Sequence, residues 1–310
     1  MNGVLNVRKE TGYTSHDVVA RLRGILHQKK IGHTGTLDPD AVGVLPVCIG
    51  RATKLVETLS GGGKTYETTL LLGLETDTQD ISGTVLSQRD VHCTEDDLRR
   101  VLEDFRGEQD QIPPMYSAKK VNGKRLYTLA REGKTISRAP ARIRIDELEL
   151  LSFALPRAKL RITCSSGTYI RTLCNDIGNA LGCGGCMEEL VRTRSGQFRL
   201  EEAHSLGEIE QYAKEGRVEE ILLPVAWFFR ELPLFRTLPD LDAPARCGNQ
   251  IPEEKLVPAE KKDVAYDVTG LPQRMRLCDS GGSFLGIYVK EEGKRRYRPA
   301  LFLYEGNEQN

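Results

Sequence analysis

The sequence lacks any long run of apolar residues. A membrane-spanning helix needs about 20 consecutive, predominantly apolar residues, so the sequence predicts no such helix. Residues 1–7 also lack the basic and then apolar layout of a secretory signal peptide. We therefore expect a soluble, cytoplasmic protein with no membrane association.

The sequence also lacks a clustered set of metal ligands. It has eight cysteines and five histidines, and they are scattered along the chain. Only Cys183 and Cys186 have the spacing of a metal-binding or redox pair, and no second pair or nearby histidine completes a tetrahedral set. We predict reduced thiols and no bound metal.

Net charge is absent as well, because 44 basic residues balance 44 acidic ones. Affinity for RNA comes largely from cationic side chains, so neutrality at first argues against a nucleic-acid partner. The charges are unevenly placed, however: residues 74–110 contain eleven acidic and four basic residues, whereas residues 111–145 contain one acidic and nine basic residues. Tyr116 and Tyr127 lie within this basic segment, where they could stack on RNA bases. Taken alone, such a segment is either an RNA-binding surface or an ordinary solvated one.

The length of 310 residues predicts about two domains, since single cores stop growing at roughly 250–300 residues. A proline-containing stretch at residues 231–242 indicates a boundary, which gives domains at 1–230 and 231–310. Within the second domain, alternating apolar residues predict strands at 274–278, 284–289 and 300–304.

Helices and strands both occur in the first domain. Capping signals at Thr14 and Thr94 predict helices that begin at the following residues, the first of them ending near His27. Apolar spacing and glycine stops predict further helices at 53–59, 125–131, 168–181 and 206–213. Strands are expected at 3–8, 43–49, 64–74, 84–87, 143–153, 158–164 and 187–200.

One carboxylate lies between a glycine-rich turn and an apolar strand, in the run of residues 32–47. The residue before a proline is kept out of the helical region, and proline fixes its own φ, so Asp38 before Pro39 sits on a stiff turn. Most Asp-Pro pairs simply reverse the chain. From the residues alone, Asp38 is either a structural turn residue or a catalytic carboxylate.

Residues 33–46 resemble the catalytic signature of the TruB family of tRNA pseudouridine synthases, which reads G-H-x-G-x-L-D-P-x-A-x-G-x-L-P. With Gly32, every fixed position of that signature is filled. Shorter family motifs are matched at residues 64–66 (K-x-Y), at the basic segment 111–127, at 167–172 (G-T-Y-I-R-[ST]) and at 190–196 (L-x-R-[TL]-x-[SV]-G).

This resemblance implies roles for particular residues. Asp38 is expected to be the nucleophile, Arg171 the cation that keeps it ionised, and Tyr66 the residue that stacks on the uracil and a candidate base for the proton at C5. Tyr169 and Leu190 are expected to line the uracil pocket. The remaining residues expected to contact the RNA are His33, Lys64, Lys119, Lys124 and Arg125.

The expected reaction breaks the bond between N1 and C1′ of uridine and rejoins the uracil through C5. It involves no net redox change and adds no outside group, so no cofactor is expected. The carboxylate of Asp38 could attack either C1′ or C6, and the sequence leaves both open. A base inside a folded tRNA loop must be flipped out, and His33 is either a residue that inserts near the vacated position or a structural turn residue.

The resemblance also implies a fold and a substrate. The expected fold is α/β (α+β): a pseudouridine synthase fold with a curved, mixed, mostly antiparallel sheet flanked by helices, an RNA-gripping insertion at about 95–142, and a small C-terminal β-rich PUA-like domain. The expected substrate is the T-stem-loop of tRNA, with the uridine at tRNA position 55 as the target. The enzyme is expected to be a monomer without an obligatory protein partner.

Two other classes stay open at this point. One is a noncatalytic RNA-binding or RNA-folding protein, and a folding role could coexist with catalysis. The other is a guide-RNA-dependent catalytic subunit of a larger particle, whose usual lysine-rich extensions this sequence lacks.

Overall fold

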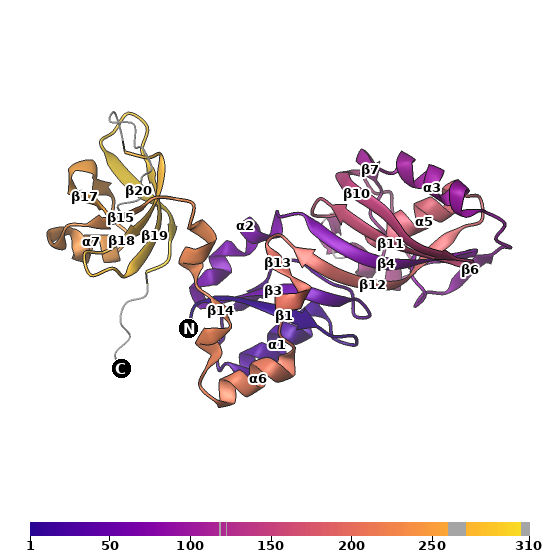
Figure 1. Cartoon of the computed structure of the whole chain (residues 1–310), viewed down its shortest axis with the longest axis horizontal. Helices are drawn as coiled ribbons and strands as arrows, with labels where there is room; N and C mark the ends of the chain where they lie inside the picture. Colours follow the sequence, from indigo (N-terminus) through magenta and orange to yellow (C-terminus); the bar gives the residue numbers. More distant parts are fainter. Residues whose placement is uncertain (118, 122, 260–270, 305–310) are drawn as a thin grey trace. The chain divides into compact units, whose positions relative to one another are not determined.

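The computed structural model describes residues 1–117, 119–121, 123–259 and 271–304. The chain divides into two compact units (Figure 1). The larger unit comprises Asn6–Val47 and Leu55–Val218, and the smaller comprises Met1–Leu5, Cys48–Lys54 and Glu219–Asn310. The boundary expected near residue 230 stays a prediction.

A mixed β-sheet forms the framework of the larger unit, with the strand order β1-β3-β12-β4-β11-β10-β7. The central strand, β4, pairs antiparallel with both of its neighbours, whereas β12 and β3 run parallel. Two short strands extend the sheet, since β2 pairs with β3 and β13 pairs with β12. The strands are β1 (Gly3–Lys9), β2 (Ile31–His33), β3 (Val42–Ile49), β4 (Lys64–Leu72), β7 (Gly107–Gln111), β10 (Ala141–Ala154), β11 (Arg157–Cys164), β12 (Gly185–Ser195) and β13 (Phe198–Arg199). The predicted mixed, mostly antiparallel sheet is confirmed.

Helices α3 (Glu95–Asp104) and α5 (Ile170–Ala180) pack against this sheet beside β10, β11 and β4 (Figure 1). Every second residue of β4 is buried, starting from Lys64, as a strand with one covered face requires. The core on this face joins Leu70 of β4 to Leu102 of α3 and Leu173 of α5. Tyr66 belongs to the same core and therefore lies on the covered face of the sheet.

The capping signals are confirmed in two helices. Thr14 caps α1 (Ser15–Ile25) and Thr94 caps α3, each through a reciprocal capping box with an aspartate three residues later. The predicted helix at 53–59 is instead split into a 3₁₀ helix, η1 (Gly50–Leu55), and a short helix, α2 (Val56–Ser60). The remaining short elements are α6 (Leu206–Lys214), η2 (Leu200–Glu202), η3 (Val218–Glu220) and η4 (Val225–Phe229).

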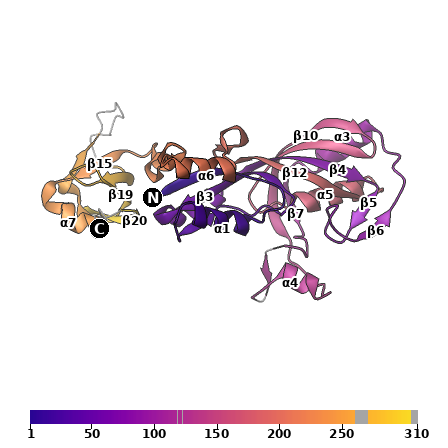
Figure 2. The ribbon, with the colours of Figure 1, turned by 90° about the horizontal axis from the view of Figure 1, so that it is seen from below.

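The basic segment forms a small substructure between β7 and β10. Two short strands, β8 (Lys120–Val121) and β9 (Lys124–Arg125), pair antiparallel and lead into α4 (Leu126–Arg131). Figure 2 shows α4 standing away from the sheet. Residues 118 and 122 of the predicted insertion lie outside the described residues. A separate hairpin, β5 (Leu74–Thr76) and β6 (Val85–Gln88), precedes α3.

In the smaller unit, six strands form a second sheet in the order β16-β20-β19-β18-β15-β17 around the buried side chains of Phe235, Leu285 and Tyr288. This confirms the predicted C-terminal β-rich domain. Its elements are β15 (Leu234–Thr237), η5 (Pro239–Leu241), α7 (Asp242–Arg246), β16 (Ile251–Pro252), η6 (Glu253–Lys255), β17 (Leu256–Pro258), β18 (Arg274–Cys278), β19 (Phe284–Lys290) and β20 (Arg296–Phe302), and β14 (Leu222–Leu223) pairs with residues 4–5 of β1. Residues 260–270 and 305–310 of this predicted domain lie outside the described part of the chain.

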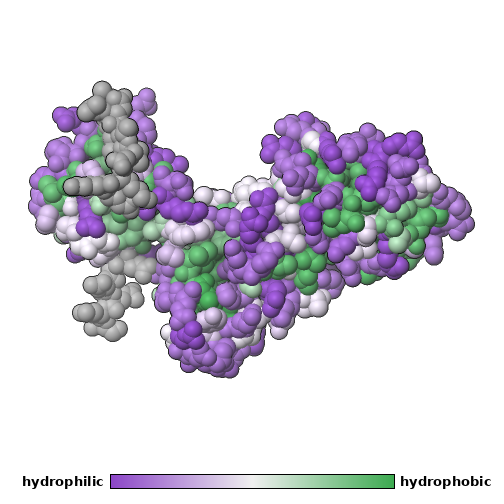
Figure 3. Space-filling view, viewed as in Figure 1, coloured by the Kyte–Doolittle hydropathy of each residue, from purple (hydrophilic) through white to green (hydrophobic). Residues whose placement is uncertain are grey.

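Most of the surface visible in Figure 3 is polar, with smaller areas of apolar side chains between the charged ones. Among the helices of the described ranges, none has both the length and the apolar character needed to cross a membrane.

Candidate active site

The turn that carries Asp38 is fixed by side chains from two other elements. Lys9, at the end of β1, is fully buried, and its ammonium donates to the carbonyl of Pro39 at 2.9 Å. Ser15, the first residue of α1, uses its hydroxyl twice on Leu37: it accepts from the backbone N–H at 2.9 Å and lies 3.2 Å from the carbonyl oxygen. The backbone on both sides of Asp38 is therefore tied to the body of the unit.

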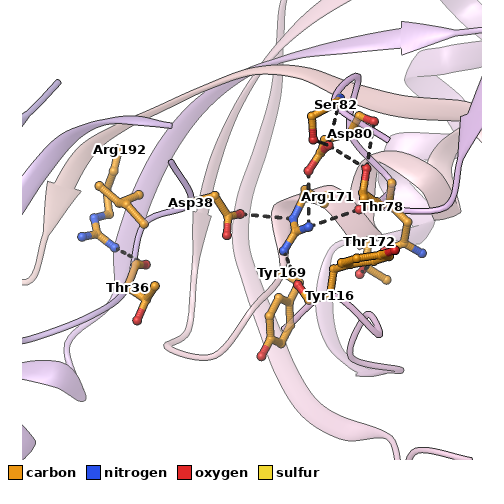
Figure 4. Close-up of polar contacts among 12 residues, drawn as sticks. Thr36, Asp38, Thr78, Asp80, Ser82, Tyr116, Tyr169, Arg171, Thr172 and Arg192 are labelled. Carbon is orange, nitrogen blue, oxygen red and sulfur yellow. Dashed lines mark hydrogen bonds and ion pairs between the residues drawn. The ribbon is translucent and has the colours of Figure 1, made fainter. Parts of the chain in front are cut away.

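Arg171 is the closest charged partner of Asp38. Its Nε lies 3.1 Å from Oδ2 of Asp38, and its side chain is only 8 % exposed, whereas that of Asp38 is 41 % exposed. The same guanidinium also lies 3.3 Å from Oδ2 of Asp80 and donates to the carbonyls of Thr78 at 3.2 Å and Tyr116 at 2.9 Å (Figure 4). The arginine is thus held from several sides, while the Asp38 carboxylate stays accessible.

Burial raises the pKa of Asp38 above its ordinary value, and the charge of Arg171 is the main effect that opposes this shift. The nearby Asp80 carboxylate raises the pKa of Asp38 further, and the ammonium of Lys9 lowers it. Burial also lowers the pKa of Lys9 to about 8, so Lys9 is still mostly charged at neutral pH. Asp38 therefore depends on Arg171 to favour its ionised form.

Asp80 is a site residue that sequence reasoning missed. Its Oδ1 accepts from the Thr78 hydroxyl at 2.7 Å and from the backbone N–H of Ser82 at 3.1 Å, which leaves Oδ2 to face Arg171. A Cβ on Gly83 would lie 2.3 Å from the Thr78 hydroxyl, so only glycine fits this tight turn. The available signal was an aspartate flanked by Thr and Ser two residues away on either side, a pattern typical of side-chain-stabilised turns.

Tyr66 lies opposite Arg192 in the register of β4 and β12. The side chain of Tyr66 is 6 % exposed and that of Arg192 is 1 % exposed. Burial raises the pKa of Tyr66, and the charge of Arg192 is the main effect that opposes this shift. The sequence motif at 190–196 contains Arg192 but gave it no role, so this residue was also missed.

Tyr169 and Leu190 lie on α5 and β12, which both contribute residues to the core of the larger unit. Tyr169 is the N-cap residue of α5, and the side-chain amide of Gln111 bridges its backbone: the N–H donates at 2.9 Å and the carbonyl accepts at 3.0 Å. Leu190 is a largely buried residue of β12. Gln111 therefore links the end of β7, where the basic segment starts, to the beginning of the helix that carries Arg171.

His33 ends β2, and its ring meets that of His16 edge to face with 5.5 Å between centroids. Burial lowers the pKa of His33, so its imidazole is neutral at neutral pH. Its Nδ1 is buried and has no hydrogen-bond partner among the described residues.

Lys64 is placed differently from the other basic residues of the predicted site. Its side chain is buried, and its ammonium donates to the carbonyls of Ser60 at 3.0 Å and Gly62 at 3.1 Å. Burial also lowers its pKa. Through these contacts Lys64 stabilises the loop before β4. Its contact with RNA stays a prediction.

The cations of the insertion fall into two groups. Lys134 and Arg142 form ion pairs with Glu132 and Glu108 at 2.8 and 3.1 Å. Within the described ranges, Lys119, Lys124 and Arg125 form no such pair. Arg125 and Arg131 instead lie 5.8 and 5.5 Å from the ring centroid of Tyr127. Cations without a carboxylate partner, in the same segment as an aromatic ring, have the chemistry needed to bind RNA.

Among the residues that the structure describes, no group of three or more His, Cys, Asp or Glu side chains is placed so that it could hold a metal ion. The site consists of the accessible carboxylate of Asp38 beside the buried guanidinium of Arg171, whose charge favours the ionised form of Asp38. A pair of this kind can chemically supply a carboxylate nucleophile.

Comparison with known sequences identifies the family to which the chain belongs. The model of the TruB family pseudouridylate synthase N-terminal domain matches residues 23–170, and that of the tRNA pseudouridylate synthase B C-terminal domain matches residues 171–229. The chain belongs to the TruB family of pseudouridine synthases. A tRNA pseudouridine synthase B from Lachnoclostridium phytofermentans is 46 % identical and covers 98 % of this chain and 100 % of the relative, and one from Bacillus velezensis is 39 % identical over the whole of both. The reaction of this chain is accordingly the formation of pseudouridine in tRNA.

Solved structures support the same fold. An H/ACA RNP bound to a substrate RNA containing 2′-deoxyuridine matches with a TM-score of 0.67 and 24 % identity, covering 98 % of this chain and 87 % of that one. A Cbf5-Nop10-Gar1 complex matches with a TM-score of 0.66 and 25 % identity, covering 98 % and 84 %. The pseudouridine synthase fold that the sequence predicted is thereby confirmed.

Proposed function

We propose that this enzyme isomerises the T-loop uridine at tRNA position 55, with Asp38 as the nucleophile. The observation that carries the proposal is the contact of 3.1 Å between Asp38 and the buried guanidinium of Arg171. A carboxylate attacks only when it is ionised, and Arg171 opposes the rise in pKa that burial imposes on Asp38. Its exposure of 41 % leaves room for a reacting atom to approach.

In the proposed reaction, the Asp38 carboxylate forms a bond to C1′ or to C6 of the flipped uridine. The bond between N1 and C1′ breaks, the uracil turns, and a new bond joins C5 to C1′ as the bond to Asp38 is released. The proton on C5 moves to a base and N1 gains a proton, so atoms and charge balance. Asp38 is regenerated, and no cofactor is required.

Tyr66 is the proposed stacking partner of the uracil. Burial raises the pKa of Tyr66, so its phenol is neutral at neutral pH. A neutral phenol accepts a proton from C5 only if it passes its own proton on, which favours the stacking role over the role of base. Tyr169 and Leu190 are proposed as further walls of the pocket, and His33, with its neutral ring, as the group that fills the position vacated by the base.

The insertion is proposed to grip the T-stem-loop through Lys119, Lys124 and Arg125, with the C-terminal β-rich domain as a PUA-like RNA-binding module. We also propose that the enzyme acts in the cytoplasm as a monomer and needs neither guide RNA nor a protein partner. Support comes from the relatives named tRNA pseudouridine synthase B, which are more similar to this chain than the H/ACA and Cbf5 structures are.

The test uses purified full-length protein and a tRNA transcript without any other component. We expect pseudouridine at position 55, mapped by chemical modification and reverse transcription, and none in a transcript with cytidine at that position. Formation only after addition of guide RNA or partner proteins would contradict the stand-alone activity, and modification at another uridine would contradict the assigned position.

A further inference from the structure

Arg192 is a buried cation that pairs with no carboxylate in the described residues. Its side chain is 1 % exposed, on strand β12. A charged group so far from water is costly unless hydrogen bonds satisfy it. Arg192 meets this requirement entirely with backbone carbonyls, which makes its position in the chain informative.

The three carbonyls lie on both sides of Asp38. Nε of Arg192 donates to the carbonyl of Val44 at 2.7 Å, and one terminal nitrogen donates to that of Gly35 at 3.1 Å. The other terminal nitrogen donates to the carbonyl of Thr36 at 3.4 Å (Figure 4). One guanidinium therefore joins the strand that follows the catalytic turn to the residues that precede it.

Arg192 also lies beside Tyr66. The two residues are partners in the register of β12 and β4, and the charge of Arg192 opposes the rise in the pKa of Tyr66 that burial causes. On its other side, β12 runs parallel to β3 with Arg192 paired to Gly43, so close that a Cβ on Gly43 would lie 2.2 Å from the Arg192 carbonyl. Arg192 is thus the residue between the turn of Asp38 and the strand of Tyr66.

We infer that Arg192 is a positioning residue, which sets the place of the Asp38 carboxylate relative to the Tyr66 ring. Its hydrogen bonds go to the backbone on either side of Asp38 and not to the Asp38 side chain, and it is assigned no contact with the substrate. The inference rests on the proposed role of Asp38, because misplacement of a carboxylate matters only if that carboxylate reacts. The planar fork of arginine reaches three carbonyls in different directions, which the single ammonium of a lysine does not reproduce.

The test compares full-length Arg192→Lys and Arg192→Gln with the wild type in pseudouridine formation on a tRNA transcript. We expect kcat to fall about 100-fold in Arg192→Gln, as a displacement near 1 Å costs, and less in Arg192→Lys, which keeps the charge. KM and the dissociation constant for RNA should stay within about twofold, since the RNA contacts are elsewhere. All rates are measured well below the melting temperature of each variant.

Arg194 provides the matched control, because it lies on the same strand and donates through Nε to the Thr65 hydroxyl at 3.1 Å, away from the turn of Asp38. Arg194→Lys should retain a kcat close to that of the wild type. The inference is overturned if folded Arg192→Lys and Arg192→Gln keep kcat within about twofold, or if KM rises while kcat is unchanged. If Arg192→Gln does not fold, the value of kcat for Arg192→Lys decides by itself. Asp38→Asn is assayed in parallel: its activity would refute the proposed nucleophile, whereas its inactivity beside fully active Arg192 variants would refute this inference alone.

Discussion

At the scale of single residues, one guanidinium connects the two carboxylates of the site. Arg171 contacts Asp38 and Asp80 and also holds the backbone of Thr78 and Tyr116. Asp80 affects the pKa of Asp38 in two opposite ways. Its charge raises that pKa directly, whereas its contact with Arg171 helps to hold the guanidinium whose charge lowers that pKa. The pKa of Asp38 therefore depends on how Arg171 is shared between the two carboxylates.

This sharing predicts the pH dependence of Arg171→Gln. The pKa of Asp38 is already raised in the folded protein, and loss of the Arg171 charge leaves burial unopposed and raises it further. In the proposed mechanism Asp38 attacks as an ionised carboxylate, so activity is lost as pH falls through the pKa of Asp38. The acidic limb of the rate profile should move to higher pH by about one unit or more.

Single-turnover rates between about pH 5 and pH 9 measure that limb. The matched control is Arg161→Gln, because Arg161 forms exposed ion pairs with Glu67 and Glu149 on the sheet, outside the site. An acidic limb at the same pH in Arg171→Gln and the wild type would show that Arg171 does not control the ionisation of Asp38.

At the same scale, the sequence indicated Asp38, Tyr66 and Arg171 because each stands in a local motif. Lys9 and Asp80 were not indicated, although both influence the pKa of Asp38. Their importance arises from contacts with residues about 30 to 90 positions away, such as Lys9 with Pro39 and Asp80 with Arg171. The spacing of neighbouring residues in the sequence does not predict such long-range contacts.

At the scale of elements, the contact of β3 with β12 depends on a glycine. Gly43 has a φ of +114°, and a Cβ there would meet the backbone of Arg192. Gly43→Ala should therefore lower the free energy of unfolding by more than about 1 kcal/mol. Gly24→Ala is the control, because Gly24 lies inside α1 with open space around it, and alanine there should stabilise the protein by about 0.5–1 kcal/mol.

Urea unfolding of the two alanine variants and the wild type provides these free energies. Equal stability of Gly43→Ala and the wild type would mean that the strands do not approach as closely as the structure has them.

The insertion predicts a difference between paired and unpaired cations. Lys124 is exposed and forms no ion pair within the described ranges, whereas Lys134 pairs with Glu132. Lys124→Gln should weaken RNA binding and reduce the slope of log Kd against log salt concentration by about 0.7–0.9, the value for one phosphate contact. Lys134→Gln should have a smaller effect on the RNA affinity and on this slope. Titrations at several salt concentrations test this, and equal slopes in all three proteins would remove Lys124 from the RNA contact.

Sequence patterns located the elements unevenly, for a physical reason. Helices α1 and α3 were found from their capping residues, because a cap is a local interaction within four residues. Strand β7 was missed, since its residues Gly-Glu-Gln-Asp-Gln are polar and it exists by pairing with β10. Strand β15 lies in a stretch that was interpreted only as a boundary, and it is held by β17 and β18. Both strands therefore form because they pair with strands elsewhere in the chain, and local sequence patterns do not predict them.

At the scale of the whole molecule, the chain contains a mixed sheet with the site and a separate C-terminal sheet with its own core. The main architecture was predictable because it follows from the family resemblance over residues 32–196, and the C-terminal sheet because apolar residues alternate along its strands. The family motifs also indicated Asp38, Tyr66 and Arg171, whereas Lys9, Asp80 and Arg192 required the structure, because their contacts with the site come from distant parts of the chain.

Asp38 is the proposed reacting carboxylate, and Asp38→Asn tests this role most directly. Asparagine has nearly the same shape and cannot act as a carboxylate nucleophile, so RNA affinity should be retained within a few fold while pseudouridine formation is abolished. The measurement is a single-turnover assay on T-loop RNA with RNA binding measured in parallel. Pseudouridine formed by Asp38→Asn at a rate near that of the wild type would show that Asp38 is not the nucleophile.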